Sequence, residues 1–225
     1  MTLYQLTGLV LIALPIAFNV LFFMLGKSFE YPDILRQTVN EILNKFVAGG
    51  SSLIALWYGF ALTALLAVPM ALLFHTVFLV EYPTLAVVSA IIGVLSGLVQ
   101  AMGLLRWSLL VPMLAKQYQA ETTSHAQRDT IEVVFNAFHQ YIGVVVGEHL
   151  GYIFTGSWTI LISIMMLTTP IFGAVMGILG IIAAIGIMVG LLEPTGWKPA
   201  GAINAISYII WSLWLIASGI ILILA

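Results

Sequence analysis

One stretch of the chain decides its fold: Phe138-His-Gln-Tyr-Ile-Gly-Val-Val-Val-Gly-Glu-His-Leu-Gly151. It places a carboxylate, two imidazoles and an amide in a run that is otherwise apolar enough to lie in lipid. Glycine recurs every four residues, at positions 143, 147 and 151, and so lines one face of a helix. Ionisable groups at membrane depth are costly, so they are expected to have partners or to line a cavity. The stretch therefore predicts a membrane helix that carries a candidate site.

The composition extends this prediction to the whole chain. Of its 225 residues, 62% are hydrophobic and only 7% are charged, whereas about a quarter of the residues of a soluble domain are charged. One span needs roughly 20 apolar residues, which leaves room for about six spans and no soluble catalytic domain. We therefore expect an all-α integral membrane protein that forms a single membrane domain over residues 1–225.

The same composition excludes several classes of function. The chain has no basic run that could follow a phosphate backbone, so nucleic acid is not an expected partner. It has no cysteine, which excludes disulfides, thiolate nucleophiles and iron–sulfur clusters. The expected partner is the lipid bilayer, with a homo-oligomer or a larger membrane complex as a further expectation.

The apolar runs predict six transmembrane helices, at about residues 3–25, 52–80, 84–115, 130–168, 170–192 and 199–224. The third and fourth are long and should form a hairpin. Between the first two spans, residues 32–47 carry apolar side chains at helical spacing, with polar residues between them. This pattern predicts an amphipathic helix, either on the membrane surface or over the mouth of the bundle.

The loop cations all fall on one side of this six-span arrangement. They are Lys27, Arg36, Lys45, Lys116, Arg128 and Lys198. The positive-inside rule makes that side cytoplasmic, so both termini are expected outside the cell (plasma) membrane. Splitting residues 130–168 into two spans would send Lys198 to the other side, which favours one long fourth helix.

Two charged residues of the hairpin are expected at similar depth. Counting back from the loop near His125, Arg106 falls opposite roughly residues 146–148, close to the cytoplasmic edge of the hydrocarbon. One interpretation is a charged pocket of Arg106, Glu148 and His149 that holds an anionic ligand or relays a proton. The other is a structural ion pair, because pairing alone lets two charges survive in apolar surroundings.

The histidines do not predict a metal site. His139 and His149 are ten residues apart, which does not match the i, i+4 spacing of a helical zinc site. No motif of a catalytic nucleophile or dinucleotide site is present, so no catalytic residue is assigned and the chain leans away from being an enzyme. A cofactor is unknown at this stage, although His139 with a partner in another subunit leaves haem binding open.

Several motifs in combination carry a resemblance. They are Phe29-Glu-Tyr-Pro-Asp-Ile-Leu-Arg36, Leu43-Asn-Lys-Phe46, Trp57-Tyr58, Leu105-Arg-Trp107, Val111-Pro-Met-Leu-Ala115 and Gly147-Glu-His-Leu-Gly151. With these, nearly the whole chain resembles an uncharacterised group of bacterial multi-span membrane proteins, the domain of unknown function 4386 family. The resemblance implies no activity or substrate. It implies that Tyr31, Pro32, Asp33 and Arg36 belong with Arg106 and Glu148.

Three functions follow as hypotheses. The first is a ligand-binding or sensory membrane protein, or an accessory subunit of a larger complex, with a cytoplasmic-side polar cavity capped by residues 31–45. The second is a small proton-coupled transporter. The third is a haem-binding protein or other membrane enzyme that uses His139 and His149.

Overall fold

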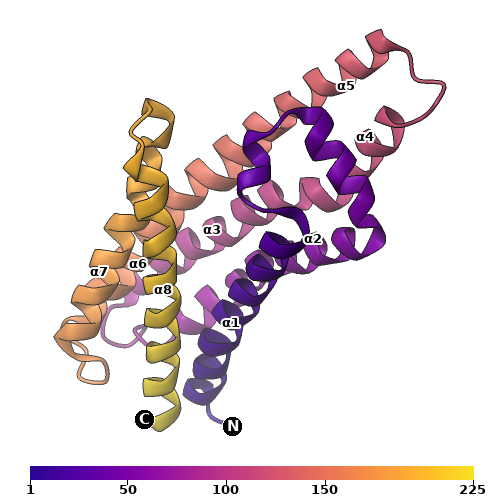
Figure 1. The fold of residues 1–225 in the computed structure, drawn as a ribbon. Helices are drawn as coiled ribbons and strands as arrows, with labels where there is room; N and C mark the ends of the chain where they lie inside the picture. The colour runs from indigo at the N-terminus through magenta and orange to yellow at the C-terminus, as the bar shows by residue number, and fades with distance from the viewer. The chain divides into compact units, whose positions relative to one another are not determined.

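The computed structural model describes all 225 residues, and the chain is helical throughout with no strand (Figure 1). The elements in chain order are α1 (Leu3–Phe29), the 3₁₀ turn η1 (Asp33–Arg36), α2 (Val39–His75), α3 (Pro83–Leu109), α4 (Val111–Tyr118), α5 (His125–Phe138), the π-helix η2 (His139–Leu150), α6 (Gly151–Met166), α7 (Gly173–Val189), the 3₁₀ turn η3 (Gly190–Thr195) and α8 (Pro199–Leu224).

Six helical runs are long and apolar enough to cross a membrane. They are Leu3–Phe29, Val39–His75, Pro83–Tyr118, His125–Met166, Gly173–Thr195 and Pro199–Leu224. The number agrees with the prediction, and residues 125–166 form one uninterrupted helical run. The second run differs from the expected 52–80, because it begins at Val39 and gives way to a series of turns after His75.

The chain divides into two compact units. Unit 1 comprises residues 1–17, 65–99 and 149–225. In it α6, α7 and α8 are neighbours, and both chain termini lie at the same end (Figure 1). A Cβ added to Gly8 would lie 2.5 Å from the Gly219 carbonyl oxygen, so the backbones of α1 and α8 nearly touch there. Small residues allow membrane helices this close approach.

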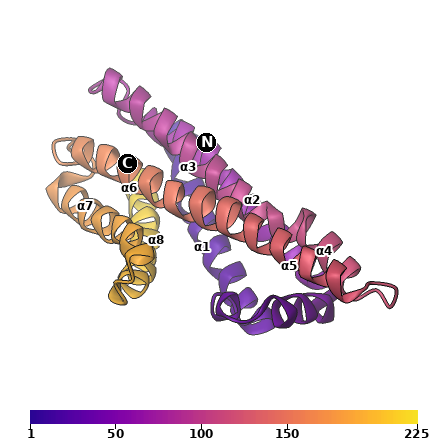
Figure 2. The ribbon, with the colours of Figure 1, turned by 90° about the horizontal axis from the view of Figure 1, so that it is seen from above.

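Unit 2 comprises residues 18–64 and 100–148. Figure 2 shows α4 beside α5 within it. Its core is aromatic: the fully buried rings of Trp57 and Trp107 stack at 4.8 Å, and Phe29 meets both edge-on. Such pairs contribute about 0.5–1.5 kcal/mol beyond the area they bury. Trp57 thus packs in the core of this unit.

The amphipathic segment belongs to unit 2. Its apolar side chains are buried in the same cluster as the aromatic core: Ile34, Val39, Ile42, Leu43 and Phe46. Its polar side chains are exposed, except for the half-buried Lys45. This face therefore packs against protein. The segment continues into α2 through a kink at Gly50, whose φ of 56° and ψ of −153° are not helical.

Two polar contacts hold this segment in place. Lys45 forms an ion pair with Glu30, the residue that follows α1 and has a left-handed φ of 57°. Gln119 Nε2, in the turn between α4 and α5, donates to Asn44 Oδ1 at 2.8 Å. The first loop of unit 2 is therefore tied both to the end of α1 and to the hairpin turn.

Candidate functional site

The site is built where α3 crosses the π-helix η2 in unit 2. A Cβ added to Gly103 would lie 2.6 Å from the Cα of Gly147, so the two backbones touch at these glycines. Arg106 stands one helical turn from Gly103 and is level with Gly143. This is about one turn from the expected position opposite residues 146–148. α3 nevertheless meets η2 at the face that its glycines line.

The Arg106 guanidinium lies directly against Gly143, in the space that a larger side chain would fill, and we call this space the glycine notch. A Cβ on Gly143 would lie 2.6 Å from both Cζ and Nη2 of Arg106. Nη1 donates to the carbonyl oxygen of Gly103 on the same helix, and the Trp107 ring lies 5.2 Å from Cζ. No side chain larger than hydrogen fits at Gly143 while the guanidinium keeps this position.

His139 is the second polar partner of Arg106. Arg106 Nη2 donates to His139 Nδ1 at 3.2 Å. Because a guanidinium has no acceptor, Nδ1 must carry the lone pair, and the remaining ring proton of the neutral imidazole sits on Nε2. The imidazole stacks on Phe135, with ring centroids 5.9 Å apart and planes 5° from parallel. His139 is thus a hydrogen-bond acceptor that orients the arginine.

Glu148 and Tyr31 complete the charge balance around Arg106. The Glu148 carboxylate interacts electrostatically with Arg106 and with Tyr31. Burial raises the pKa of the Tyr31 phenol, the Glu148 charge raises it further, and the Arg106 charge lowers it. Tyr31 therefore stays a neutral phenol at physiological pH. Its ring lies 5.0 Å from that of Trp57, which anchors it in the aromatic core.

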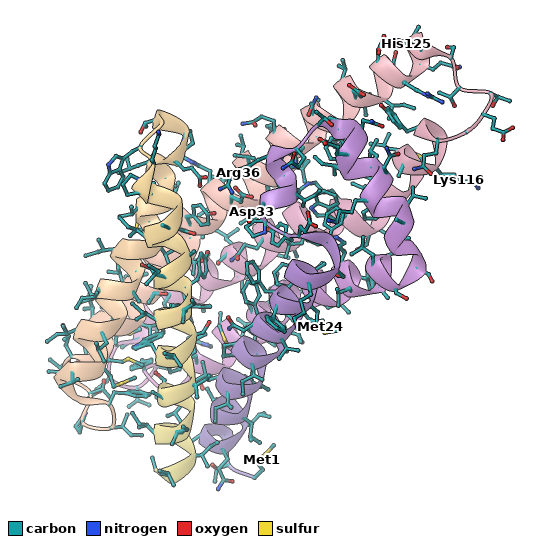
Figure 3. All side chains as sticks on the ribbon, in the orientation of Figure 1. Met1, Met24, Asp33, Arg36, Lys116 and His125 are labelled. Carbon is teal, nitrogen blue, oxygen red and sulfur yellow. The ribbon has the colours of Figure 1, made fainter.

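The remaining predicted residues lie elsewhere. Asp33 and Arg36 are highly exposed and form a 2.6 Å ion pair with each other, and Figure 3 shows them together on η1. His149 is a half-buried residue of unit 1, whereas the Arg106 cluster belongs to unit 2. The cluster that the structure brings together is therefore Arg106, His139, Glu148 and Tyr31, and we call it the Arg106 cluster.

The Arg106 cluster presents one positively charged group, the guanidinium, whose position is fixed by hydrogen bonds. The bonds to Gly103 and His139 use two of the five guanidinium N–H groups. The side chain is half-buried, and carboxylates and phosphates are the groups whose geometry matches the guanidinium fork. No group of three or more His, Asp and Glu side chains that could hold a metal ion is present in the chain.

A helical fold with six apolar runs and a charged cluster between two of them defines a multi-pass membrane protein. The chain belongs to the family described as domain of unknown function (DUF4386), whose family model matches residues 6–219. No curated protein and no solved structure matched the chain.

Two functional features escaped the sequence analysis. Gly103 was not singled out from the sequence, although it provides the close contact with η2. The bond between Arg106 and His139 was also not foreseen, since an ordinary helix was expected through residues 139–150. The one available signal was the position of Gly103, three residues before an arginine in an apolar run.

Proposed function

We propose that this protein is a ligand-binding or sensory membrane protein that takes a small anionic group at Arg106. The observation that carries the proposal is the fixed, half-buried guanidinium in the glycine notch. A residue held by two hydrogen bonds in a defined plane is preorganised, so binding costs little side-chain entropy. An accessory subunit of a larger complex could use the same site.

Three features support an anion as the ligand. The arginine is always charged and presents a planar set of donors. The Glu148 carboxylate interacts electrostatically with Arg106, and an incoming anion would compete with it for the same guanidinium charge. Tyr31 adds a neutral hydroxyl to the same cluster. Because Tyr31 sits in the tied first loop, that loop would respond to ligand at Arg106, as a sensor requires.

The distribution of loop cations supports a cytoplasmic position for this site. Lys116 and His125 lie at the end of unit 2 where α4 joins α5 (Figure 3), and Arg36 and Lys45 belong to the same unit. By the positive-inside rule, we propose that these cations face the cytoplasm and that both termini face the opposite side. The ligand would then come from the cytoplasm or from the headgroups of the inner leaflet.

The proposal is tested by ligand-dependent stability. The melting temperature of the purified protein is measured in phosphatidylcholine nanodiscs with inorganic phosphate or acetate, and in nanodiscs that contain phosphatidylglycerol. The protein should be stabilised by at least one of these anions, and Arg106→Gln should abolish that stabilisation. Glu148→Gln should strengthen it, because a competing negative charge is removed. An anion effect that is the same in Arg106→Gln as in the parent protein would refute the proposal.

A proton-coupled transporter is the second candidate, and one feature of unit 1 favours it. Buried hydroxyls follow α6 at four-residue spacing: Thr155 bonds Ser96 at 2.7 Å, Thr159 accepts from Trp211 Nε1 at 2.8 Å, and the buried Ser163 hydroxyl has no partner. Polar groups within a span are typical of proton or ion pathways. Proteoliposomes loaded with a pH-sensitive dye test it. A Ser163→Ala variant that leaves proton flux unchanged would refute this route.

A further inference from the structure

A second candidate site lies in unit 1, on the face shared by the last turn of α2 and the first half of α3. A groove of about 400 Å³ opens there, lined by Leu72, His75, Val87, Ala90, Ile91, Val94 and Leu95. This volume is within the usual range for small-molecule sites, about 300–1,000 Å³. His75 is the one polar side chain of the lining. The groove is independent of the Arg106 cluster, which belongs to unit 2.

The hydrogen bonding of His75 fixes which ring nitrogen can bind a ligand. α2 ends at His75, and the Thr76 amide bonds Leu73 instead of continuing the helical series to Leu72. The Leu72 carbonyl oxygen is left for the imidazole, whose Nδ1 lies 2.5 Å away. A histidine at a helix C-terminus commonly caps a carbonyl in this way. Since a carbonyl only accepts, Nδ1 carries the proton, and Nε2 of the neutral ring is an acceptor.

The groove therefore has a polar end and an apolar body. His75 stands at the end next to the turn that joins α2 and α3. Along α3 the lining runs from Val87 to Leu95, which is about 12 Å at 1.5 Å per residue. Val87, Ile91 and Leu95 are exposed at the rim, so in a bilayer the groove opens toward lipid.

We propose that this groove binds a long-chain lipid with a terminal hydroxyl, which donates its hydrogen bond to His75 Nε2 while its hydrocarbon lies along α3. A donor is required because Nε2 offers only a lone pair. The hydrocarbon is required because every other lining side chain is apolar. An ordinary acyl chain without a donor satisfies the apolar body and leaves the imidazole nitrogen without a partner, which is unfavourable in a low-dielectric environment.

The test compares two probes that differ only in the donor. Full-length protein in detergent is titrated with a pyrene-tagged long-chain alcohol and with the methyl ether of the same alcohol, and binding is followed by energy transfer from tryptophan. The parent protein should bind the alcohol about 3- to 10-fold more tightly, the factor that one net hydrogen bond supplies. In His75→Phe the preference should disappear. Equal affinities of the parent for both probes, or an unchanged preference in His75→Phe, would overturn the proposal.

A second pair of variants keeps the test decisive if His75→Phe fails to fold. Val87 and Val88 are adjacent, both exposed, and only Val87 lines the groove. Val87→Phe should lower the affinity for both probes several-fold by filling the groove, and Val88→Phe should leave it unchanged. Equal effects of the two substitutions would show that the probes bind elsewhere and would likewise overturn the proposal.

Discussion

Replacing Gly143 with alanine should displace the Arg106 guanidinium and destabilise unit 2. The new Cβ would lie 2.6 Å from Cζ and Nη2 of Arg106, while ordinary contacts of a Cβ begin at about 3.4 Å. The guanidinium must therefore move by roughly 1 Å. A shift of this size breaks the geometry of its bonds to the Gly103 carbonyl and to His139.

The magnitude follows from two opposing contributions. Losing or weakening two hydrogen bonds from a charged donor costs about 1.5–3 kcal/mol each when they are fully lost. Because Arg106 is only half-buried, water can replace part of the lost hydrogen bonding and so reduces this cost. Alanine in place of glycine in a helix returns up to about 1 kcal/mol. The net destabilisation should be about 2 kcal/mol, which for a chain of this length lowers the melting temperature by about 4–8 °C.

The assay is thermal unfolding of the purified protein in one detergent, with Gly59→Ala as the matched control. A Cβ on Gly59 would meet only Leu21 side-chain carbons at 3.7 and 3.8 Å, in ordinary contact. Gly59→Ala should therefore be neutral or slightly stabilising. If Gly143→Ala were as stable as Gly59→Ala, the guanidinium would not occupy the notch and the reasoning would be refuted.

Three further outcomes are expected. Gly50→Ala should destabilise by about 1–3 kcal/mol, because Gly50 has open space around it but a φ and ψ that only glycine adopts readily; an unchanged melting temperature would contradict the kink. Gly103→Ala should destabilise more than Gly143→Ala, since its Cβ meets the backbone of Gly147 rather than a movable side chain; the reverse order would contradict the crossing point. The pKa of Tyr31 is raised in the folded protein. The contribution of its neutral phenol to stability is therefore fully present below the ordinary tyrosine pKa of about 10, and it is lost as the pH rises above that value. The melting temperature of Tyr31→Phe should therefore fall less steeply above that pH than that of the parent, and identical slopes would argue against a buried phenol.

The helices of this fold could be predicted from sequence because each apolar run is long enough to need no tertiary information. The amphipathic pattern of residues 32–47 also located the buried face of the segment after α1. The pattern left open whether lipid or protein covers that face, because both are apolar. The structure shows Phe46 and its neighbours packed in the aromatic core of unit 2.

The local details of the site were beyond the sequence. The same apolar sequence can form either an α-helix or a π-helix. Nothing in residues 139–150 therefore indicated the wider turn of η2. The wider turn and the contact of Gly103 with Gly147 together decide where His139 stands relative to Arg106. Such contacts depend on how two helices cross, which a single sequence does not encode in its periodicity. The π-helix itself is of interest, since these helices occur frequently at functional sites.

The association of Asp33 and Arg36 with Arg106 was expected from the family resemblance, and the positive-inside rule put both sets on the same side. The structure pairs them with each other at the surface. The same motif, residues 29–36, nevertheless includes Tyr31, whose phenol interacts electrostatically with both Arg106 and Glu148. The first loop thus contributes to the Arg106 cluster through its tyrosine.

The most direct test of the account is calorimetric titration of inorganic phosphate into the protein in phosphatidylcholine nanodiscs, comparing the parent with Arg106→Gln and Arg36→Gln. Arg36 is the matched control, an exposed arginine of the same unit that is paired with Asp33. The account predicts saturable heat in the parent and in Arg36→Gln, and none in Arg106→Gln. A titration of Arg106→Gln that matches the parent would contradict it.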